Sequence, residues 1–185
     1  MERVPFRATR LAEPYDHIAP LPVSLLLDNV RSMYNVGSFF RTADGAAVER
    51  IYLSGITARP PKNAITKTAL GAEETVPWVD CREPLATVRE LRAQGYEIAA
   101  AETAVTAVDL FDWQPRWPVL LLFGHEVDGV NAELLGQCDT YVRLPMLGLK
   151  HSLNVASAGA ILLYELLRKY RQRRGVAQDR FVSPL

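Results

Sequence analysis

The sequence has little cysteine and no long apolar run, and each shortage excludes a class of protein. Its two cysteines, Cys81 and Cys138, are too few and too isolated for a disulfide framework or a zinc cluster, so both are expected to be packing residues. Apolar runs such as Val119–Phe123 are much shorter than the roughly 20 residues that cross a bilayer. Because no apolar signal core follows Met1, we expect a cytoplasmic protein without a membrane segment.

Common catalytic and nucleotide-binding signatures are also absent. No G-x-G-x-x-G or G-x-x-x-x-G-K-S pattern follows a candidate strand, which excludes the usual dinucleotide and triphosphate cradles. There is no G-x-S-x-G elbow, and His151 and Ser152 are adjacent at a helix start, so a hydrolase triad is not expected. The histidines His17, His125 and His151 lack metal-ligand spacing, and we therefore predict no metal site.

The net charge is zero, from 21 basic and 21 acidic side chains, which at face value argues against a nucleic-acid partner. The distribution of the basic residues is more informative than the sum. Three arginines lie near the N-terminus, and five cations lie at the end of the last predicted helix: Arg168, Lys169, Arg171, Arg173 and Arg174. These five are candidate RNA phosphate contacts, although cations also suit the C-terminal end of a helix dipole.

Hydrophobic periodicity predicts strands that alternate with helices along a chain of 185 residues. The predicted strands are 23–27, 50–53, 75–78, 96–101, 119–123 and 141–144. The predicted helices are 35–45, 83–94, one from about residue 131, and one from Ser152 or Asn154 to about residue 170. This alternation predicts an α/β fold with a mostly parallel sheet and helices on both faces. We expect an N-terminal arm (1–21), one domain (22–174) and a C-terminal tail (175–185).

Three strand ends are candidate ligand loops, because α/β sheets bind ligands at the carboxyl ends of their strands. They are Glu102-Thr103, residues 124–129 and residues 145–152. The helix after the last loop opens with the small residues Ala156 to Ala160, which predicts close packing against another backbone. Its apolar residues 161–163, 166 and 167 exceed one helix stripe, so we expect part of this helix in a homodimer interface. An ordinary N-capped core helix is the alternative.

Three motifs occur in order along the chain. They are Asn35-Val-Gly37-x-x-x-Arg41-Thr42, then Phe123-Gly124-x-Glu126-x-x-Gly129, then Pro145-Met146-x-Gly148-x-x-x-Ser152-Leu153-Asn154-Val155-Ala156. Over about residues 22–170 the chain resembles the SpoU (TrmH-like) branch of the SPOUT RNA methyltransferases. The resemblance implies S-adenosylmethionine as cofactor, a trefoil knot in the C-terminal third, a homodimer, and methylation of a ribose 2′-hydroxyl in tRNA or rRNA.

The resemblance also implies roles for individual residues. Arg41 would be the central catalytic residue, supported by Asn35, Glu126, Ser152 and Asn154. The cofactor would be held by backbone groups of Thr103, Gly124, Leu144, Met146 and Leu153. A guanidinium stays charged in proteins, so we expect Arg41 to grip a phosphate and stabilise the developing oxyanion, not to act as a base.

Two other functions are compatible with the sequence. One is a catalytically silent RNA-binding relative, which the joint presence of Arg41, Glu126 and Asn154 argues against. The other is a nucleotide-binding α/β protein that acts on a small molecule, which the zero net charge leaves open.

Overall fold

The computed structural model describes residues 19–175 of the chain. The expected N-terminal arm, apart from its last three residues, therefore lies outside the described residues. The same is true of the expected tail after Gly175.

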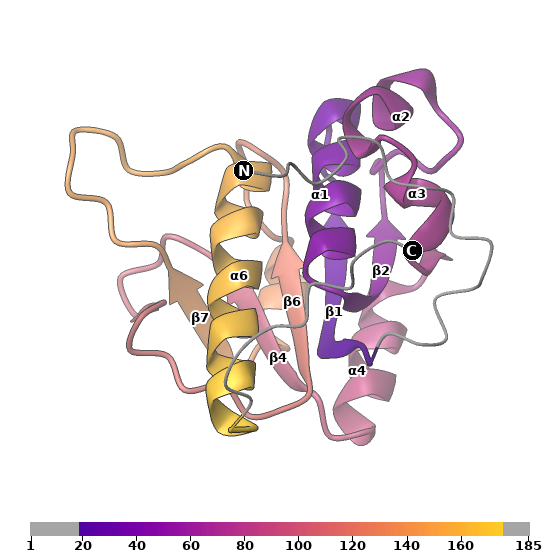
Figure 1. Cartoon of the computed structure of the whole chain (residues 1–185). Helices are drawn as coiled ribbons and strands as arrows, with labels where there is room; N and C mark the ends of the chain where they lie inside the picture. The colour runs from indigo at the N-terminus through magenta and orange to yellow at the C-terminus, as the bar shows by residue number, and fades with distance from the viewer. Residues whose placement is uncertain (1–18, 176–185) are drawn as a thin grey trace, which may run out of the picture.

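Seven parallel strands form a single sheet in the described part of the chain, in the order β3-β2-β1-β6-β4-β7-β5 (Figure 1). The strands are β1 Leu21–Asp28, β2 Val48–Ser54, β3 Trp78–Cys81, β4 Glu97–Ala101, β5 Val108–Asp109, β6 Val119–Phe123 and β7 Thr140–Arg143. The run Val119–Phe123 is buried throughout, as a central parallel strand covered on both faces requires. Strands β2 and β3 are added on one side of β1 and the later strands on its other side, beginning with β6. Sheets of this type bind ligands at such a switch point, which here lies between β1 and β6.

Helices cover both faces of the sheet (Figure 1), as the sequence predicts. One face is covered by α1 Met33–Gly45, α2 Asn63–Ala69, α3 Ala72–Thr75 and α6 Val155–Arg173. The other is covered by α4 Pro84–Ala93 and α5 Ala132–Leu135. The alternation of strand side chains divides the core accordingly, so Leu25 and Leu27 belong to the first cluster and Leu26 to the second.

The small residues at the start of α6 serve packing within the chain. Gly159 faces the ring of Phe39 on α1 so closely that any Cβ would overlap it. Leu162, Leu163 and Leu166 are buried in the chain's own core, so the part of this helix that is expected in a homodimer interface lies at other residues. Ile161 is different, because 41% of it is exposed.

Two predicted boundaries are wrong, and the sequence pattern predicts neither α2 nor the two-residue strand β5. Helix α1 begins at Met33 and is capped by the Ser32 side chain, two residues before the predicted start at Asn35. Residues 75–78 are not a strand, because Thr75 ends α3 and β3 begins only at Trp78. Residues 63–69 form α2, which packs on α1. A Cβ at position 37 of α1 would overlap the Ile65 carbonyl of α2, so this contact needs Gly37. The two-residue strand β5 has no sequence signal.

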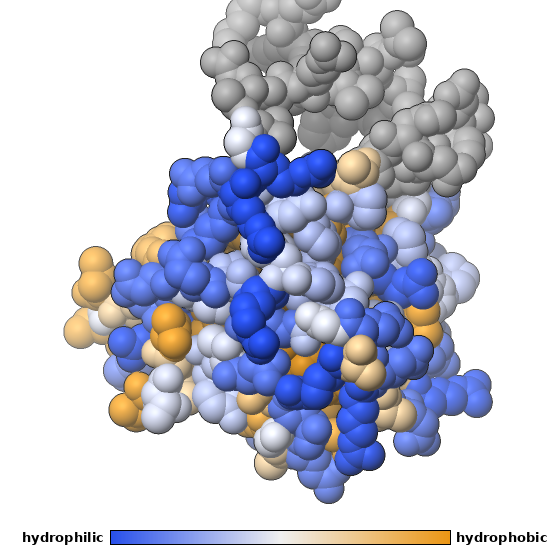
Figure 2. All heavy atoms as spheres, turned by 90° about the horizontal axis from the view of Figure 1, so that it is seen from below, coloured by the Kyte–Doolittle hydropathy of each residue, from blue (hydrophilic) through white to orange (hydrophobic). Residues whose placement is uncertain are grey.

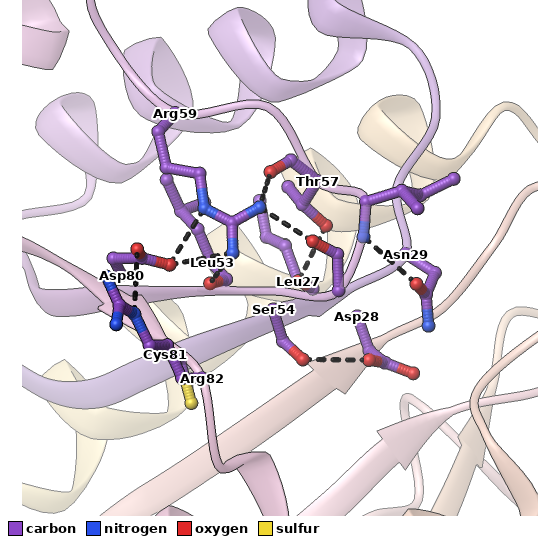
Figure 3. Close-up of polar contacts among 12 residues, drawn as sticks. Leu27, Asp28, Asn29, Leu53, Ser54, Thr57, Arg59, Asp80, Cys81 and Arg82 are labelled. Atoms are coloured by element: carbon purple, nitrogen blue, oxygen red, sulfur yellow. Dashed lines mark hydrogen bonds and ion pairs between the residues drawn. The ribbon is translucent and has the colours of Figure 1, made fainter.

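A polar network holds the loop after β2 against the segment that leads into α1 (Figure 3). The buried Thr57 hydroxyl donates to the Leu27 carbonyl at 2.9 Å and accepts the Val30 N–H at 3.0 Å. Arg59 donates to Asp80 at 2.7 and 2.9 Å, and to the carbonyls of Gly55 and Thr57. These contacts fix the path of the chain between β1 and α1, and hence the start of α1.

The end of the molecule at the amino ends of the strands is mainly hydrophilic, with apolar residues scattered over it (Figure 2). Arg92 and Asp139 form an ion pair of 2.7 Å there. Among residues 19–175, no helix is long and apolar enough to cross a membrane.

Candidate functional site

A pocket of about 470 Å³ lies at the carboxyl ends of β4, β6 and β7, next to the start of α6. We call it the strand-end pocket. Its lining comes from residues 101–103, 123–129, 142–144, 146, 151–155 and 158, together with Leu162. Residues from all three strand ends that the sequence identifies as ligand loops are among them. The volume lies within the range of small-molecule and cofactor sites.

Most of the predicted site residues meet at this pocket. Its lining includes all five residues expected to hold a cofactor, namely Thr103, Gly124, Leu144, Met146 and Leu153. Three of the five expected catalytic residues also line it, namely Glu126, Ser152 and Asn154. Asn35 reaches the pocket rim through hydrogen bonds to Glu126 and Asn154, whereas Arg41 does not line the pocket.

Two glycines shape the loop after β6. His125 and Gly129 exchange two backbone hydrogen bonds of 2.9 Å, which folds residues 125–129 back on themselves. A Cβ on Gly124 would overlap the backbone of Gly129 and Val130, and Gly129 itself has a φ of +74°. Both positions of the F-G-x-E-x-x-G motif therefore need glycine.

Glu126, in the loop after β6, helps to cap the N-terminus of α1, which follows the neighbouring strand β1. Its carboxylate accepts the backbone N–H groups of Arg31 and Ser32, both at 3.0 Å, and the Asn35 side-chain amide at 2.9 Å. Burial raises the pKa of Glu126, but these hydrogen bonds outweigh burial, so the pKa is lowered below its ordinary value. Glu126 therefore stays ionised at neutral pH, at the positive end of the helix dipole.

Asn154 caps α6 and is bonded to Asn35. Its Oδ1 accepts the N–H groups of Ala156 and Ser157 at 3.0 and 3.2 Å, and its Nδ2 donates to Asn35 Oδ1 at 3.1 Å. One residue from each motif thus contributes to a continuous chain, Glu126–Asn35–Asn154, that joins the N-termini of two helices. Through these hydrogen bonds the three side chains hold the starts of α1 and α6 in place.

Arg41 lies on the outer face of α1. Its side chain is exposed, while Val36, Phe40 and Ala43 on the opposite side of the helix are buried in the core. Tyr34 occupies the same outer face and is also exposed. Arg41 is therefore open to another molecule but stands apart from the strand-end pocket of its own chain.

The basic residues at the end of α6 differ in exposure, because Lys169 is buried whereas Arg173 and Arg174 are exposed. Lys169 is only 8% exposed; its ammonium donates to the Leu110 carbonyl at 2.7 Å and to the Trp113 carbonyl, and it pairs with Glu165 at 3.6 Å. Burial lowers the pKa of Lys169, and the charge of Glu165 opposes that shift. The prediction that Lys169 contacts RNA is wrong, because its charge is used inside the fold.

The arginines of this helix end are more accessible. Arg168 forms a bidentate pair with Glu165, with two hydrogen bonds of 2.7 Å. Arg173 and Arg174 are exposed, and Arg174 lies 5.8 Å from the centre of the Tyr170 ring.

Sequence reasoning missed two residues of the site. Ser32 caps α1, although its signal, a serine just before the helix, is present in the sequence. Glu102 lies on a predicted ligand loop without a predicted role; it lines the pocket, and its Oε1 accepts the Val130 N–H at 2.8 Å. Within residues 19–175, no group of three or more His, Cys, Asp and Glu residues is arranged to hold a metal ion.

Comparison with known proteins relates most of this chain to one family. A family model described as the SpoU rRNA Methylase family matches residues 22–164. A 23S rRNA (guanosine-2′-O-)-methyltransferase of Ralstonia nicotianae, RlmB, is 33% identical over 163 residues, which cover 88% of this chain and 65% of the relative. A Staphylococcus haemolyticus protein whose name places it in the TrmH family of tRNA/rRNA methyltransferases is 31% identical over 152 residues, covering 82% and 61%.

The fold agrees with that comparison. The crystal structure of an AdoMet-bound rRNA methyltransferase from Sinorhizobium meliloti superposes with a TM-score of 0.74 at 29% identity, over 86% of this chain and 62% of that one. The chain spans less than two thirds of the length of the two curated relatives.

Proposed function

Because the chain belongs to the SpoU rRNA methylase family, we propose that it transfers a methyl group from S-adenosylmethionine to a ribose 2′-hydroxyl of tRNA or rRNA. The observation that carries this proposal is the Glu126–Asn35–Asn154 chain at the rim of the strand-end pocket. It joins one residue from each of three distant motifs beside a pocket that suits a nucleoside cofactor. The name of the Ralstonia relative, which specifies guanosine-2′-O methylation, supports the reaction type.

The lining of the strand-end pocket fits the proposed cofactor. Its volume of about 470 Å³ suits a ligand of nucleoside size, and the closed 124–129 loop brings backbone close to the pocket. In our proposal, backbone groups of Thr103, Gly124, Leu144, Met146 and Leu153 bind it. When bound, S-adenosylmethionine supplies an electrophilic methyl group on a sulfonium. The residues of this chain orient that methyl group and the ribose hydroxyl.

Glu126, Asn35 and Asn154 are positioning residues in this proposal. Their hydrogen bonds set the distance between the start of α1 and the start of α6. Helix α1 carries the catalytic arginine further along, and the start of α6 forms one wall of the pocket. Ser152 is exposed beside Asn154, and in this proposal it contacts the RNA.

Arg41 acts on the RNA in our proposal, and it does so across a homodimer. Its side chain is exposed on the outer face of α1 and lies outside its own strand-end pocket. The neighbouring outer face of α6 carries Ile161 and Tyr164, which are 41% and 52% exposed. A second copy that covers these faces brings Arg41 towards the pocket of the partner, where its charge stabilises the oxyanion.

The exposed arginines at the end of α6 are the proposed phosphate contacts. Arg173 and Arg174 are the best placed, because Arg168 is already paired with Glu165. Arg171 completes the proposed set. Such contacts increase affinity for any RNA and position it on the protein, without selecting a sequence.

One experiment tests the reaction directly. The protein is incubated with methyl-labelled S-adenosylmethionine and either total tRNA or rRNA, and the labelled nucleotide is mapped. A ribose 2′-O-methyl group makes the next phosphodiester bond resistant to alkali, so label in an alkali-stable dinucleotide is expected. Label on a base would refute ribose methylation. RNA binding without any label would indicate a catalytically silent RNA-binding relative. Label transfer to a small molecule would indicate a nucleotide-binding α/β protein that acts on small molecules.

A further inference from the structure

We propose that Glu102 makes the strand-end pocket prefer the positively charged cofactor over its neutral thioether product. This inference rests on the proposed function, because it assumes that the pocket binds S-adenosylmethionine. Glu102 follows directly after the buried strand segment of β4 and lines the pocket together with Ala101 and Thr103.

The fold holds the Glu102 carboxylate in one place. Its Oε1 accepts the Val130 N–H at 2.8 Å, and the residue's own N–H donates to the Val142 carbonyl at 3.0 Å. Gly129 lies against it, because a Cβ on that glycine would be 2.6 Å from Oε1. The half-buried side chain therefore presents a fixed negative charge to the pocket.

The charges of the other two carboxylates that line the pocket are stabilised by helix amides in one case and by solvent in the other. Glu126 faces the amide groups at the N-terminus of α1. Asp128 lies 3.0 Å from the His125 ring and is mostly exposed, so solvent screens it. Glu102 has one neutral backbone donor, and no ion pair joins it to any residue of the described part of the chain.

The basic lining residues do not change this conclusion. Arg143 and His151 lie on the β7 and α6 side of the pocket, where they are exposed, and neither forms an ion pair with Glu102. A ligand with a positive charge would therefore provide the opposite charge that the Glu102 carboxylate does not find in the protein. A carboxylate without an ion-pair partner favours such a ligand through space, without needing direct contact.

Methyl transfer removes that charge from the ligand. The new bond forms between the methyl carbon and the ribose oxygen, which gives up its proton to water, while the carbon–sulfur bond breaks and its electron pair stays on sulfur. The sulfonium becomes a neutral thioether. Attraction to Glu102 then falls, which favours release of S-adenosylhomocysteine and entry of a new cofactor molecule.

The test compares three ligands on the wild-type protein and on Glu102→Gln by calorimetry. The ligands are S-adenosylmethionine, S-adenosylhomocysteine and sinefungin, which carries an amine at the position of the methylated sulfur. We expect Glu102→Gln to weaken the two cationic ligands by about five- to tenfold and the thioether by less than about twofold. The preference of the wild type for the cationic ligands should also shrink as salt is added.

Glutamine can still accept the Val130 N–H, and the ratio of two affinities on one variant is independent of any loss of folded protein. Glu133→Gln is the matched control, because it removes the same charge from an exposed position on α5 and should leave all ratios unchanged. An equal loss for all three ligands would overturn the proposal and assign Glu102 to a group that they share, such as the ribose or the ammonium. Unchanged affinities would also overturn it. If the wild type bound none of the three, the proposed function itself would be refuted.

Discussion

The side-chain amide of Asn154 donates a 3.1 Å hydrogen bond to Oδ1 of Asn35, although 119 positions separate the two residues. Each asparagine also serves a helix start, since Asn154 caps α6 and Asn35 donates to the carboxylate that caps α1. The bond therefore couples two helix N-termini beside the strand-end pocket.

A double-mutant cycle should detect this coupling. Asn154→Ala removes a cap and a cross-link, and we expect it to lower the free energy of unfolding by about 1–2 kcal/mol. Asn35→Ala should cost about 1 kcal/mol, and the double variant should cost less than the sum by about 0.5–1 kcal/mol. Urea unfolding measures all three. Asn131→Ala is the control, because Asn131 caps α5 in the same way without a bond to Asn35. Strict additivity of the 35 and 154 changes would contradict the coupling.

Stability should depend on pH through Glu126. Its pKa is lower in the folded protein than in the unfolded chain, so its contribution is present above the ordinary glutamate range and disappears as the pH falls through the folded value. Glu126→Gln should therefore cost about 0.5–1 kcal/mol at pH 7, and the difference from the wild type should vanish in acid, once the pH has fallen below the lowered pKa of the folded state. Urea unfolding at a series of pH values measures it, with the exposed Glu90→Gln as control. A difference that is independent of pH would show that the charge of Glu126 is irrelevant.

Arg41→Ala should abolish methyl transfer while cofactor binding survives. We expect a rate loss of about a hundred- to a thousandfold, because the guanidinium acts on the RNA and the oxyanion, and a change in cofactor affinity of less than about twofold. Single-turnover assays and calorimetry measure the two quantities. The exposed Arg50→Ala, on β2, is the control for loss of a positive charge. A loss of cofactor affinity in proportion to the rate would contradict the assignment.

Mixing variants tests whether Arg41 acts across a dimer. Arg41→Ala is mixed with Thr103→Trp, which obstructs the pocket at an exposed lining residue. If Arg41 serves the partner, a mixed dimer has one complete site, and an equal mixture recovers about a quarter of the wild-type activity. If Arg41 serves its own pocket, no site is complete and no activity returns.

The wild-type protein should be a dimer in solution. Light scattering at micromolar concentration should give about twice the chain mass of 20.6 kDa. Ile161→Glu places a charge in the proposed interface and should shift the mass towards the monomer, since the residue is exposed in the single chain. Ala86→Glu, at an exposed position on α4, is the control and should leave the mass unchanged. A wild-type monomer would rule out catalysis across a dimer.

The cations at the end of α6 should separate into two classes. Changing Arg168, Arg171, Arg173 and Arg174 to Gln should weaken RNA binding and reduce the salt slope by up to about 0.7–0.9 for each lost phosphate contact. Lys169→Gln should leave that slope unchanged and destabilise the fold by roughly 2–4 kcal/mol, because buried carbonyls and Glu165 lose their partner. Affinity is measured against salt, and stability by urea unfolding. Equal slopes for the wild type and the arginine variant would place the RNA site elsewhere.

Local pattern was sufficient to predict the α/β fold because the strands carry their own signal. The strands β1, β4 and β6 are apolar runs that suit a sheet covered on both faces, and α4 has a proline at its first turn. The weaker elements escaped prediction because other segments stabilise them. Helix α2 has seven residues and depends on its fit against Gly37, and β5 has only two. The trefoil knot stays a prediction of the family resemblance.

The order of three motifs, a local property, was enough to identify the family and the residues around the strand-end pocket. Only the tertiary structure decided what those side chains do, because each finds its partner far away in the chain. Glu126 helps to cap a helix that begins some 90 positions earlier, Arg41 does not line its own pocket, and Lys169 donates to backbone carbonyls of the 110–113 segment. Composition and spacing determine which groups are present; the packing of α1 and α6 on the sheet determines which of them remain free to act.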